Sequence, residues 1–141
     1  VWWWLERDLG SYAIQQVLCM ASFDGHVGVV RLLLGVPGVD INSTRGGGET
    51  PLCYASFRGH VEVVRLLTAV PGIDVNQRRA YSWTPLQGAS CHGRVEIVRL
   101  LLAVPGVDVN AVYGGGWTAL YTASRNGHVE VVRLLKAHGA E

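Results

Sequence analysis

The residues best suited to chemistry in this sequence are one cysteine–histidine pair and two glycine runs. Cys91 and His92 are a nucleophile and a base, the combination used in covalent catalysis. Adjacent residues of a helix point roughly 100° apart, so this pair does not converge on one substrate atom. The runs at 46–48 and 114–116 lack the Lys-Ser/Thr that completes a phosphate-binding P-loop, and the only lysine is Lys136. We therefore expect no catalytic residues and no nucleotide site.

Metal binding and disulfide bonding are also poorly supported. The three cysteines, Cys19, Cys53 and Cys91, form no Cys-x-x-Cys pair, so a structural zinc site is not expected. An odd, sparse cysteine count argues against a disulfide scaffold and favours a reducing compartment. We expect an intracellular, cytoplasmic protein that holds neither a metal ion nor a cofactor.

Composition limits the class of protein further. The 141 residues are 49% hydrophobic and 16% charged, which suits one folded domain rather than a disordered chain. A formal net charge of +1 gives no general attraction to nucleic acid. No apolar run approaches the roughly 20 residues that a membrane-spanning helix needs. We expect a monomer with no nucleic-acid partner and no membrane span.

The elements that carry these residues recur with a period of 34 residues, the spacing between Thr50 and Thr84. The tripeptide Thr50-Pro51-Leu52 returns as Thr84-Pro85-Leu86 and as Thr118-Ala119-Leu120. Ala-Ser, Gly-His and Pro-Gly pairs follow in the same register. A fixed period of this length indicates a stack of repeated units. The units are residues 11–44, 45–78, 79–112 and 113–141.

Each unit encodes two helices. Thr50 can cap the first helix with its hydroxyl, and Pro51 is tolerated at the first helical position. Gly59 can adopt the left-handed conformation that ends this helix. The second helix carries Glu62 and Arg65, a surface pair on an otherwise apolar segment. One such unit cannot bury its own apolar face, whereas stacked copies can, which predicts an all-α solenoid.

The repeated words resemble the ankyrin repeat family over residues 11–141. They are Thr-Pro-Leu-x-x-Ala, Gly-His-Val-Glu-Val-Val-Arg-Leu-Leu and Asp-Val-Asn. The resemblance implies helix-turn-helix repeats joined by β-hairpin-like loops. Two features depart from the family. One residue is inserted in each Val-Pro-Gly-Val linker, and the histidine that usually bonds neighbouring loops is replaced by Cys53, Gln87 and Tyr121. We therefore do not expect the usual bonding between loops.

The resemblance implies a protein–protein interaction module or scaffold rather than an enzyme. Ankyrin repeats mostly bind partners through a concave helix face and the hairpin tips. Two other interpretations stay open at this point. In the first, the chain is a targeting or regulatory segment of a larger enzyme, channel or ubiquitin ligase. In the second, it is a structural spacer without a partner on that face.

The family's contact positions fall before each Thr and at the end of each first helix. These positions vary while the rest of the unit repeats, and they are rich in aromatic and arginine side chains, which dominate binding hot spots. A basic, aromatic face favours a partner with acidic and apolar segments. For Trp83 and Trp117, packing on their own hairpins is an equal alternative. The predicted contact residues are Phe57, Arg58, Arg79, Tyr81, Trp83, Cys91, His92, Tyr113, Trp117, Arg125 and Asn126.

The two ends depart from the pattern. Residues 1–10 do not fit the repeat, and we expect Trp2-Trp3-Trp4 to cover the open apolar end of the first unit as a cap. A membrane or partner anchor is the alternative for these tryptophans. The last unit stops at Glu141, short of the pattern of its siblings, and terminal repeats normally carry a more polar outer face. We expect the chain to be a fragment of a longer protein.

Overall fold

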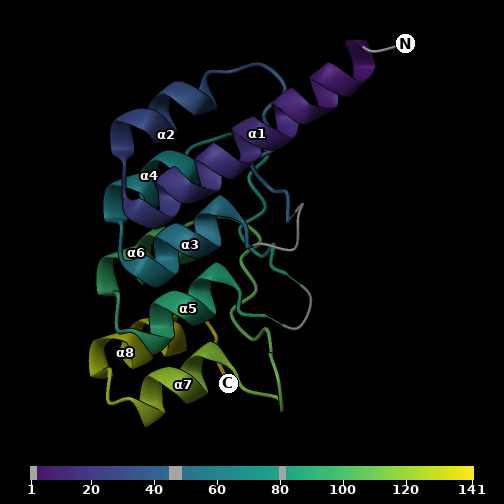
Figure 1. Cartoon of the computed structure of the whole chain (residues 1–141). Coiled ribbons are helices and arrows are strands. Elements are labelled where there is room, and N and C mark those ends of the chain that lie inside the picture. Colours follow the sequence, from purple (N-terminus) through teal and green to yellow (C-terminus); the bar gives the residue numbers. More distant parts are fainter. Residues whose placement is uncertain (1–2, 45–48, 80–81) are drawn as a thin grey trace.

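A computed structural model describes residues 3–44, 49–79 and 82–141, with side chains from residue 10 onward. These residues form eight helices and no strand, which confirms the predicted all-α helix-turn-helix solenoid (Figure 1). The helices lie in two rows, with short helices stacked side by side. The first row is α1 (Trp3–Asp24), α3 (Pro51–Arg58), α5 (Pro85–Cys91) and α7 (Ala119–Arg125). The second row is α2 (Val27–Leu34), α4 (Val61–Thr68), α6 (Val95–Leu102) and α8 (Val129–Ala137).

The first-row helices begin and end where the sequence signals predict. Thr50 Oγ1 accepts a hydrogen bond from the backbone N–H of Cys53 at 3.1 Å, as an N-cap residue does. Thr84 does the same for Gln87 at 3.2 Å, and Gln87 Oε1 accepts from the Thr84 N–H at 2.8 Å, which completes a capping box. Gly59 ends α3 with a φ of 85°, a left-handed conformation that suits glycine.

The core is a continuous column between the two rows of helices. Leu52 and Leu86, from the first row, are 1% and 2% exposed, and Leu67 and Leu101, from the second row, are fully buried. Each leucine is followed one period later by its counterpart, so every repeat covers the apolar surface of its neighbour. Burial of these side chains against the adjacent repeat supplies the main driving force for stacking.

A ladder of asparagines joins each repeat to the next at the Pro-Gly linkers. Asn42 Nδ2 donates to the Gly72 carbonyl at 2.9 Å, and Asn42 Oδ1 accepts from the Asp74 N–H at 2.7 Å. Asn76 repeats both bonds one period later, to the Gly106 carbonyl at 2.8 Å and the Asp108 N–H at 2.7 Å. The linker that carries the inserted residue therefore turns its glycine carbonyl toward the preceding repeat.

The ladder continues to the last residue of the chain, where the linker is one residue shorter. Asn110 Oδ1 accepts from the Glu141 N–H at 3.0 Å, and Asn110 Nδ2 donates to the Gly139 carbonyl at 3.4 Å. Both bonds are longer than their counterparts at Asn76. The inserted residue of the internal linkers thus gives the closer fit between repeats.

A second contact between repeats places a histidine over a glycine. His60 Nε2 lies 2.8 Å from the Phe23 carbonyl at the end of α1. A Cβ built on Gly25 would lie 2.5 Å from the His60 ring, so this position needs glycine for space as well as for its φ of 77°. His128 bears the same relation to Gly93. His60 and His128 therefore join adjacent repeats at these turns.

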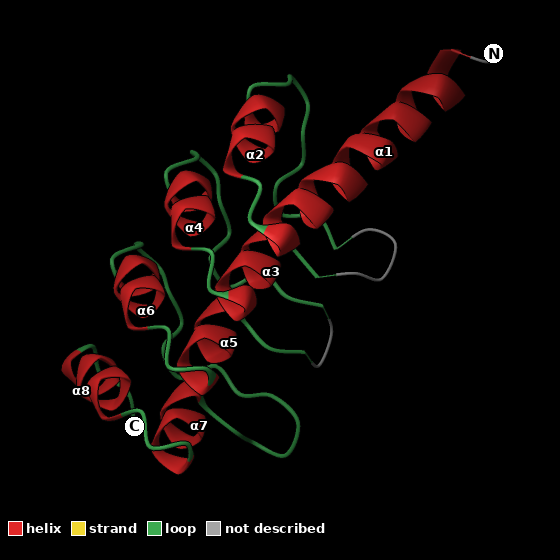
Figure 2. Ribbon diagram, turned by 60° about the vertical axis from the view of Figure 1, so that its left-hand side comes forward, coloured by secondary structure: helices red, strands yellow, loops and turns green. Residues whose placement is uncertain are grey.

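The first helix is longer than its siblings. α1 runs without a break across Gly10, so the predicted boundary between residues 1–10 and the first repeat falls inside one helix. Figure 2 shows its N-terminal half running on beyond the stack. Met20 and Leu32, which face away from the second repeat, are 63% and 77% exposed. The side chains of residues 1–9 lie outside the described part of the structure, and a cap made by the tryptophans stays a prediction.

None of the helices in the described residues is long and apolar enough to cross a membrane. The longest, α1, carries Glu6, Arg7 and Asp8 near its start.

Replacing Asn76 with alanine removes both of its bonds to the next repeat. At about 0.5–1.5 kcal/mol for each net hydrogen bond, we expect the free energy of unfolding to fall by about 1–3 kcal/mol. Urea denaturation followed by circular dichroism measures this change. Asn110→Ala is the matched control, and its longer bonds predict a smaller loss. An equal or larger loss for Asn110→Ala would contradict the proposed role of the internal linkers.

Candidate partner-binding face

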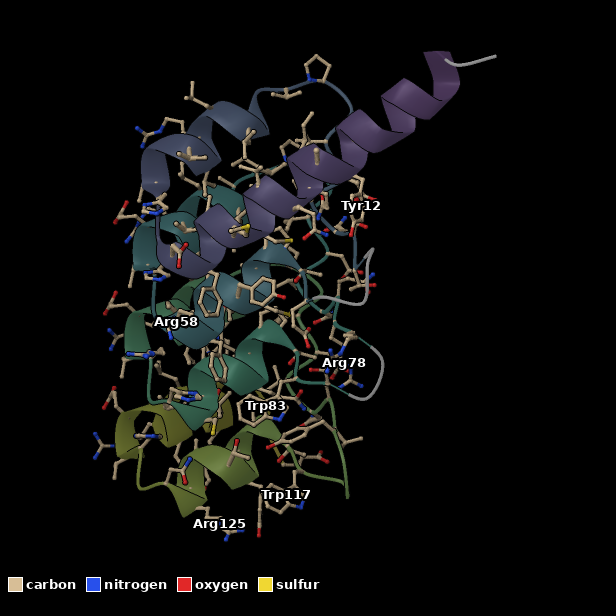
Figure 3. All side chains as sticks on the ribbon, in the orientation of Figure 1. Tyr12, Arg58, Arg78, Trp83, Trp117 and Arg125 are labelled. Atoms are coloured by element: carbon tan, nitrogen blue, oxygen red, sulfur yellow. The ribbon has the colours of Figure 1, made fainter. Side chains whose placement is uncertain are left out.

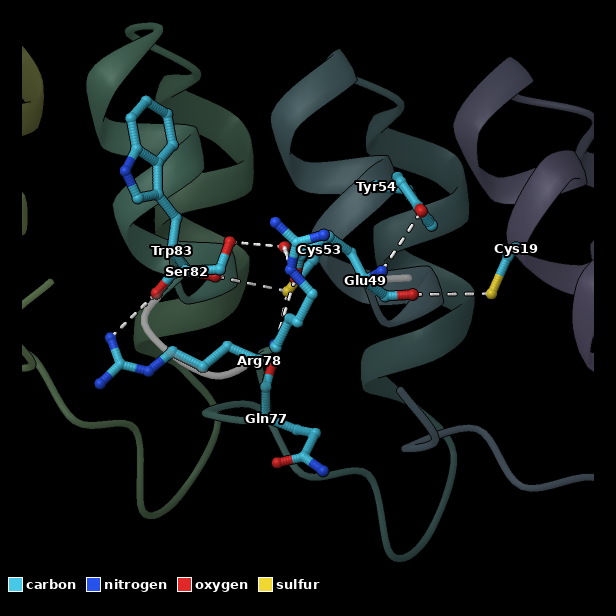
Figure 4. Close-up of polar contacts among 9 residues, drawn as sticks. Cys19, Glu49, Cys53, Tyr54, Gln77, Arg78, Ser82 and Trp83 are labelled. Atoms are coloured by element: carbon cyan, nitrogen blue, oxygen red, sulfur yellow. Dashed lines mark hydrogen bonds and ion pairs between the residues drawn. The ribbon is translucent and has the colours of Figure 1, made fainter. Parts of the chain in front are cut away.

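The hairpins before each first-row helix are held by side chains that replace the family's usual histidine. Cys53 Sγ donates to the carbonyls of Gln77 and Trp83, at 3.3 and 3.7 Å. Gln87 Nε2 donates to the Ala111 carbonyl at 2.7 Å. Our expectation that the bonding between loops would be lost at these positions is wrong. A thiol and an amide donate where the imidazole would, so the loops remain connected (Figure 4).

The thiols in these contacts are kept protonated by burial. Burial raises the pKa of Cys53 to about 12, and it raises the pKa of Cys19 to about 11. Cys19 Sγ donates to the Glu49 carbonyl at 3.7 Å, the equivalent contact one repeat earlier. All three cysteines are free. Cys19 and Cys53 are therefore structural donors rather than nucleophiles.

Glu49 ties the second hairpin to the third. Its carboxylate accepts from the Ser82 hydroxyl and, at 3.3 Å, from the Arg79 N–H. The Arg79 Nε atom lies 3.8 Å from the same carboxylate. Tyr54 Oη accepts from the Glu49 N–H at 3.2 Å (Figure 4). The predicted contact residue Arg79 thus has an intramolecular partner, and its charge is partly neutralised.

Arg78 joins the third hairpin to the fourth in a similar way. Its Nη1 atom donates to the carbonyls of Ser82 and Val112, at 3.1 and 2.8 Å. Figure 3 shows Arg78 on the hairpin side of the stack, beside the third repeat. Arg78, which is not among the predicted contact residues, therefore supports the hairpins rather than offering a free charge.

Aromatic side chains form a continuous row from the second repeat to the fourth. The Trp83 ring centroid lies 5.8 Å from Phe57 and 5.2 Å from Tyr113. Tyr113 in turn lies 6.2 Å from Trp117, which lies 5.1 Å from Tyr121. Trp83 is half-buried in this row, while Trp117 is 39% exposed and Tyr121 is 48% exposed. The predicted residues Phe57, Trp83, Tyr113 and Trp117 therefore lie together on one face.

Two arginines lie over rings of the same face. The guanidinium carbon of Arg58 is 4.6 Å from the centroid of Phe23, and that of Arg125 is 5.4 Å from the centroid of Trp117. These are cation–π distances. Neither arginine pairs with a carboxylate in the part of the chain that the structure describes. Both are exposed, so their charges are available to a partner (Figure 3).

The remaining predicted residues at the helix ends make contacts within the stack. Asn126 Nδ2 donates to the Cys91 carbonyl at 2.9 Å, and His128 Nε2 lies 3.0 Å from the same oxygen. His92 Nδ1 lies 3.0 Å from the Gly88 carbonyl. Cys91 and His92 therefore bond to different partners and not to each other. Tyr81 lies outside the described residues, as do the glycines at 46–48.

A hollow of about 290 Å³ opens on this face between α3 and α5. Phe23, Tyr54, Phe57, Trp83 and Gly88 are among the residues that line it. Sequence reasoning missed Tyr54 and Gly88. The signal was available, because their shared repeat position holds a different residue in every unit, as the contact positions do. That set is Met20, Tyr54, Gly88 and Thr122.

The described residues contain no group of three histidine, cysteine or acidic side chains that could hold a metal ion. The arrangement of this face is suited to contact with another macromolecule: exposed rings, unpaired guanidinium groups and one small apolar hollow.

The comparisons with known proteins agree with this architecture. The sequence model of a family described as ankyrin repeats (3 copies) matches residues 18–113 and, in a second match, residues 72–141. Together the two matches include every hairpin and all the first-row helix ends described above. Among curated proteins, none matches the chain.

Thiol alkylation distinguishes the buried cysteines from Cys91. With iodoacetamide at pH 8, we expect Cys53 to react at least about tenfold more slowly than Cys91, because its raised pKa keeps it protonated and its neighbours cover it. Mass spectrometry of tryptic peptides gives the rates. In denaturing urea the rates should converge. Faster reaction of Cys53 than of Cys91 in the native protein would contradict the hydrogen-bonded position of Cys53.

Proposed function

Because the chain belongs to the ankyrin repeat family, we propose that it is a scaffold that binds a partner protein across the first-row helix ends and the hairpins. Ankyrin repeats are generally protein-interaction modules and are typically not catalytic. The observation that supports this surface is the row of exposed and half-buried aromatic and arginine side chains on one face. We call it the aromatic–arginine face. It comprises Phe57, Arg58, Trp83, Tyr113, Trp117, Tyr121 and Arg125.

The pairing of the arginines supports a partner with acidic and apolar segments. On the second row, Arg65, Arg99 and Arg133 each pair with a glutamate three residues earlier, at 2.6–3.4 Å. On the aromatic–arginine face, Arg58 and Arg125 lie over rings and have no such partner among the described residues. An acidic segment would supply the missing carboxylates, and the exposed rings would pack on its apolar side chains.

We further propose that the chain acts inside the cell, in the cytoplasm, as a monomer and without a cofactor. The three free cysteines support a reducing compartment. Two of them donate hydrogen bonds to hairpin carbonyls as thiols, a role that oxidation would remove.

Affinity capture with matched variants tests the proposed face. We expect Phe57→Ala and Trp117→Ala to lose the partner that the unaltered chain captures, since both rings are exposed on the proposed surface. Leu32→Ala is the control, because Leu32 is 77% exposed but lies on α2 in the second row. If both ring variants still capture the partner, the proposed face is wrong and a structural spacer is favoured.

Charge reversal at Arg58 tests the electrostatic part. We expect Arg58→Glu to slow association with the captured partner several-fold at low ionic strength, roughly three- to tenfold, because rim charges act mainly on the association rate. Biolayer interferometry at low and high salt measures it, and the difference should shrink as salt screens the charges. Arg31→Glu on α2 makes the same change in net charge away from the face. Equal slowing by both variants would contradict a local role for Arg58.

A further inference from the structure

The hollow on the aromatic–arginine face is lined by residues of the first three repeats. Phe23 and Tyr54 pack edge to face, with ring centroids 5.6 Å apart. Phe57 and Trp83 form a second ring pair in the lining, with centroids 5.8 Å apart. Two aromatic pairs thus line the hollow, and its lining is mainly apolar. Such a site excludes water from whatever group enters it, which is the property of a binding hot spot.

Gly88 is the residue that keeps the hollow open. It lies in α5 at the position where the second repeat has Tyr54 and the fourth has Thr122. A Cβ built on Gly88 would lie 3.7 Å from Phe57 and 3.7 Å from Trp83, which is ordinary contact. A side chain at this position would therefore be tolerated and would extend between the two rings. Glycine within a helix is unfavourable by about 1 kcal/mol relative to alanine, so its presence here has no benefit for the helix itself.

The hollow is small and mainly apolar. Ligand sites for drug-sized molecules occupy roughly 300–1,000 Å³, and this hollow of about 290 Å³ lies at the lower limit of that range. One bulky apolar side chain is the occupant that matches its volume and lining.

The charges around the hollow indicate an anionic neighbour for that side chain. Glu49, the only acidic residue in the lining, already accepts from Ser82 and Arg79 and has a side chain only 19% exposed. Because its carboxylate already has these partners, Glu49 is poorly suited to bind a cation between the rings. Arg58 lies over Phe23, one of the wall residues, and has no carboxylate partner among the described residues. Arg58 therefore places a positive charge without a described carboxylate partner next to a lining residue of the hollow.

We propose that the hollow is an anchor pocket for one bulky apolar side chain of the partner, and that an acidic residue beside that side chain pairs with Arg58. This inference rests on the proposed function and specifies the segment that the partner presents. An exposed rim pair with Arg58 adds orientation and association rate, while the buried side chain supplies most of the affinity.

Selection from a phage-displayed random dodecapeptide library against the full chain tests this proposal. We expect enriched peptides to carry a Leu, Met, Phe or Trp with an Asp or Glu within two residues. Fluorescence polarisation of a labelled enriched peptide then gives affinities for the variants. Gly88→Leu fills the pocket and should weaken binding at least about tenfold, and Gly88→Ala should weaken it less. Arg58→Glu should weaken it about three- to tenfold at low salt.

Gly28→Leu is the matched control. Gly28 lies in α2, and a Cβ built there meets nothing within 4 Å, so the same substitution is made in a helix far from the pocket. We expect it to leave peptide affinity unchanged. Thermal melting of each variant checks that the fold is intact, and Gly88→Ala gives the same test with a smaller change should Gly88→Leu melt early.

Three results would overturn the pocket assignment. The library could yield no enriched peptide, synthetic basic or trimethylammonium-bearing peptides could compete better than acidic ones, or Gly88→Leu could leave the peptide affinity unchanged. The proposed function is tested separately. If Trp117→Ala abolishes capture of the partner while Gly88→Leu leaves it intact, the face binds the partner and the pocket assignment is wrong. If neither substitution affects capture, both proposals fail.

Discussion

Stacking of successive repeats in a fixed register is the constraint on which the fold and the candidate site both depend. Burial of the leucine column drives the stacking, but apolar contact has little directionality and does not by itself set the register. Polar contacts at fixed spacing do so. Asn76 makes two hydrogen bonds to the next linker, His60 sits over Gly25, and Cys53 donates to two hairpin carbonyls. Each joins adjacent repeats only, as expected for a solenoid.

The aromatic–arginine face is a consequence of that register. Phe57 belongs to the second repeat, Trp83 to the third and Tyr113 to the fourth, yet their rings lie 5.2–5.8 Å apart in sequence order along the stack. Each ring supports the next, so the face is ordered before a partner arrives, which lowers the entropic penalty of binding. Arg58 and Arg125 are held over rings in the same way, and their charges remain exposed.

The elements of this structure were predictable wherever the information lies within one repeat. Thr50 and Gly59 marked the limits of α3, and the spacing of Glu62 and Arg65 anticipated their ion pair. Contacts between repeats were harder to predict, because they depend on distances that the period alone does not give. The donor role of Cys53 was missed for this reason, since a thiol rarely replaces an imidazole in a hydrogen-bond network. The length of α1 was also missed, because residues 1–10 do not fit the repeat and yet most of them continue the first helix of the stack.

A repeat scaffold allows one position to change its function without disturbing the rest. The position of Gly88 contacts the neighbouring repeat's surface but carries none of the bonds that set the register. Its side chain can therefore vary from Met20 to Thr122 while the stack persists. Removing the side chain in the third repeat weakens one helix by about 1 kcal/mol, an amount that nearest-neighbour stacking absorbs. The same removal leaves an apolar space beside two aromatic pairs, which a side chain of a second molecule can fill.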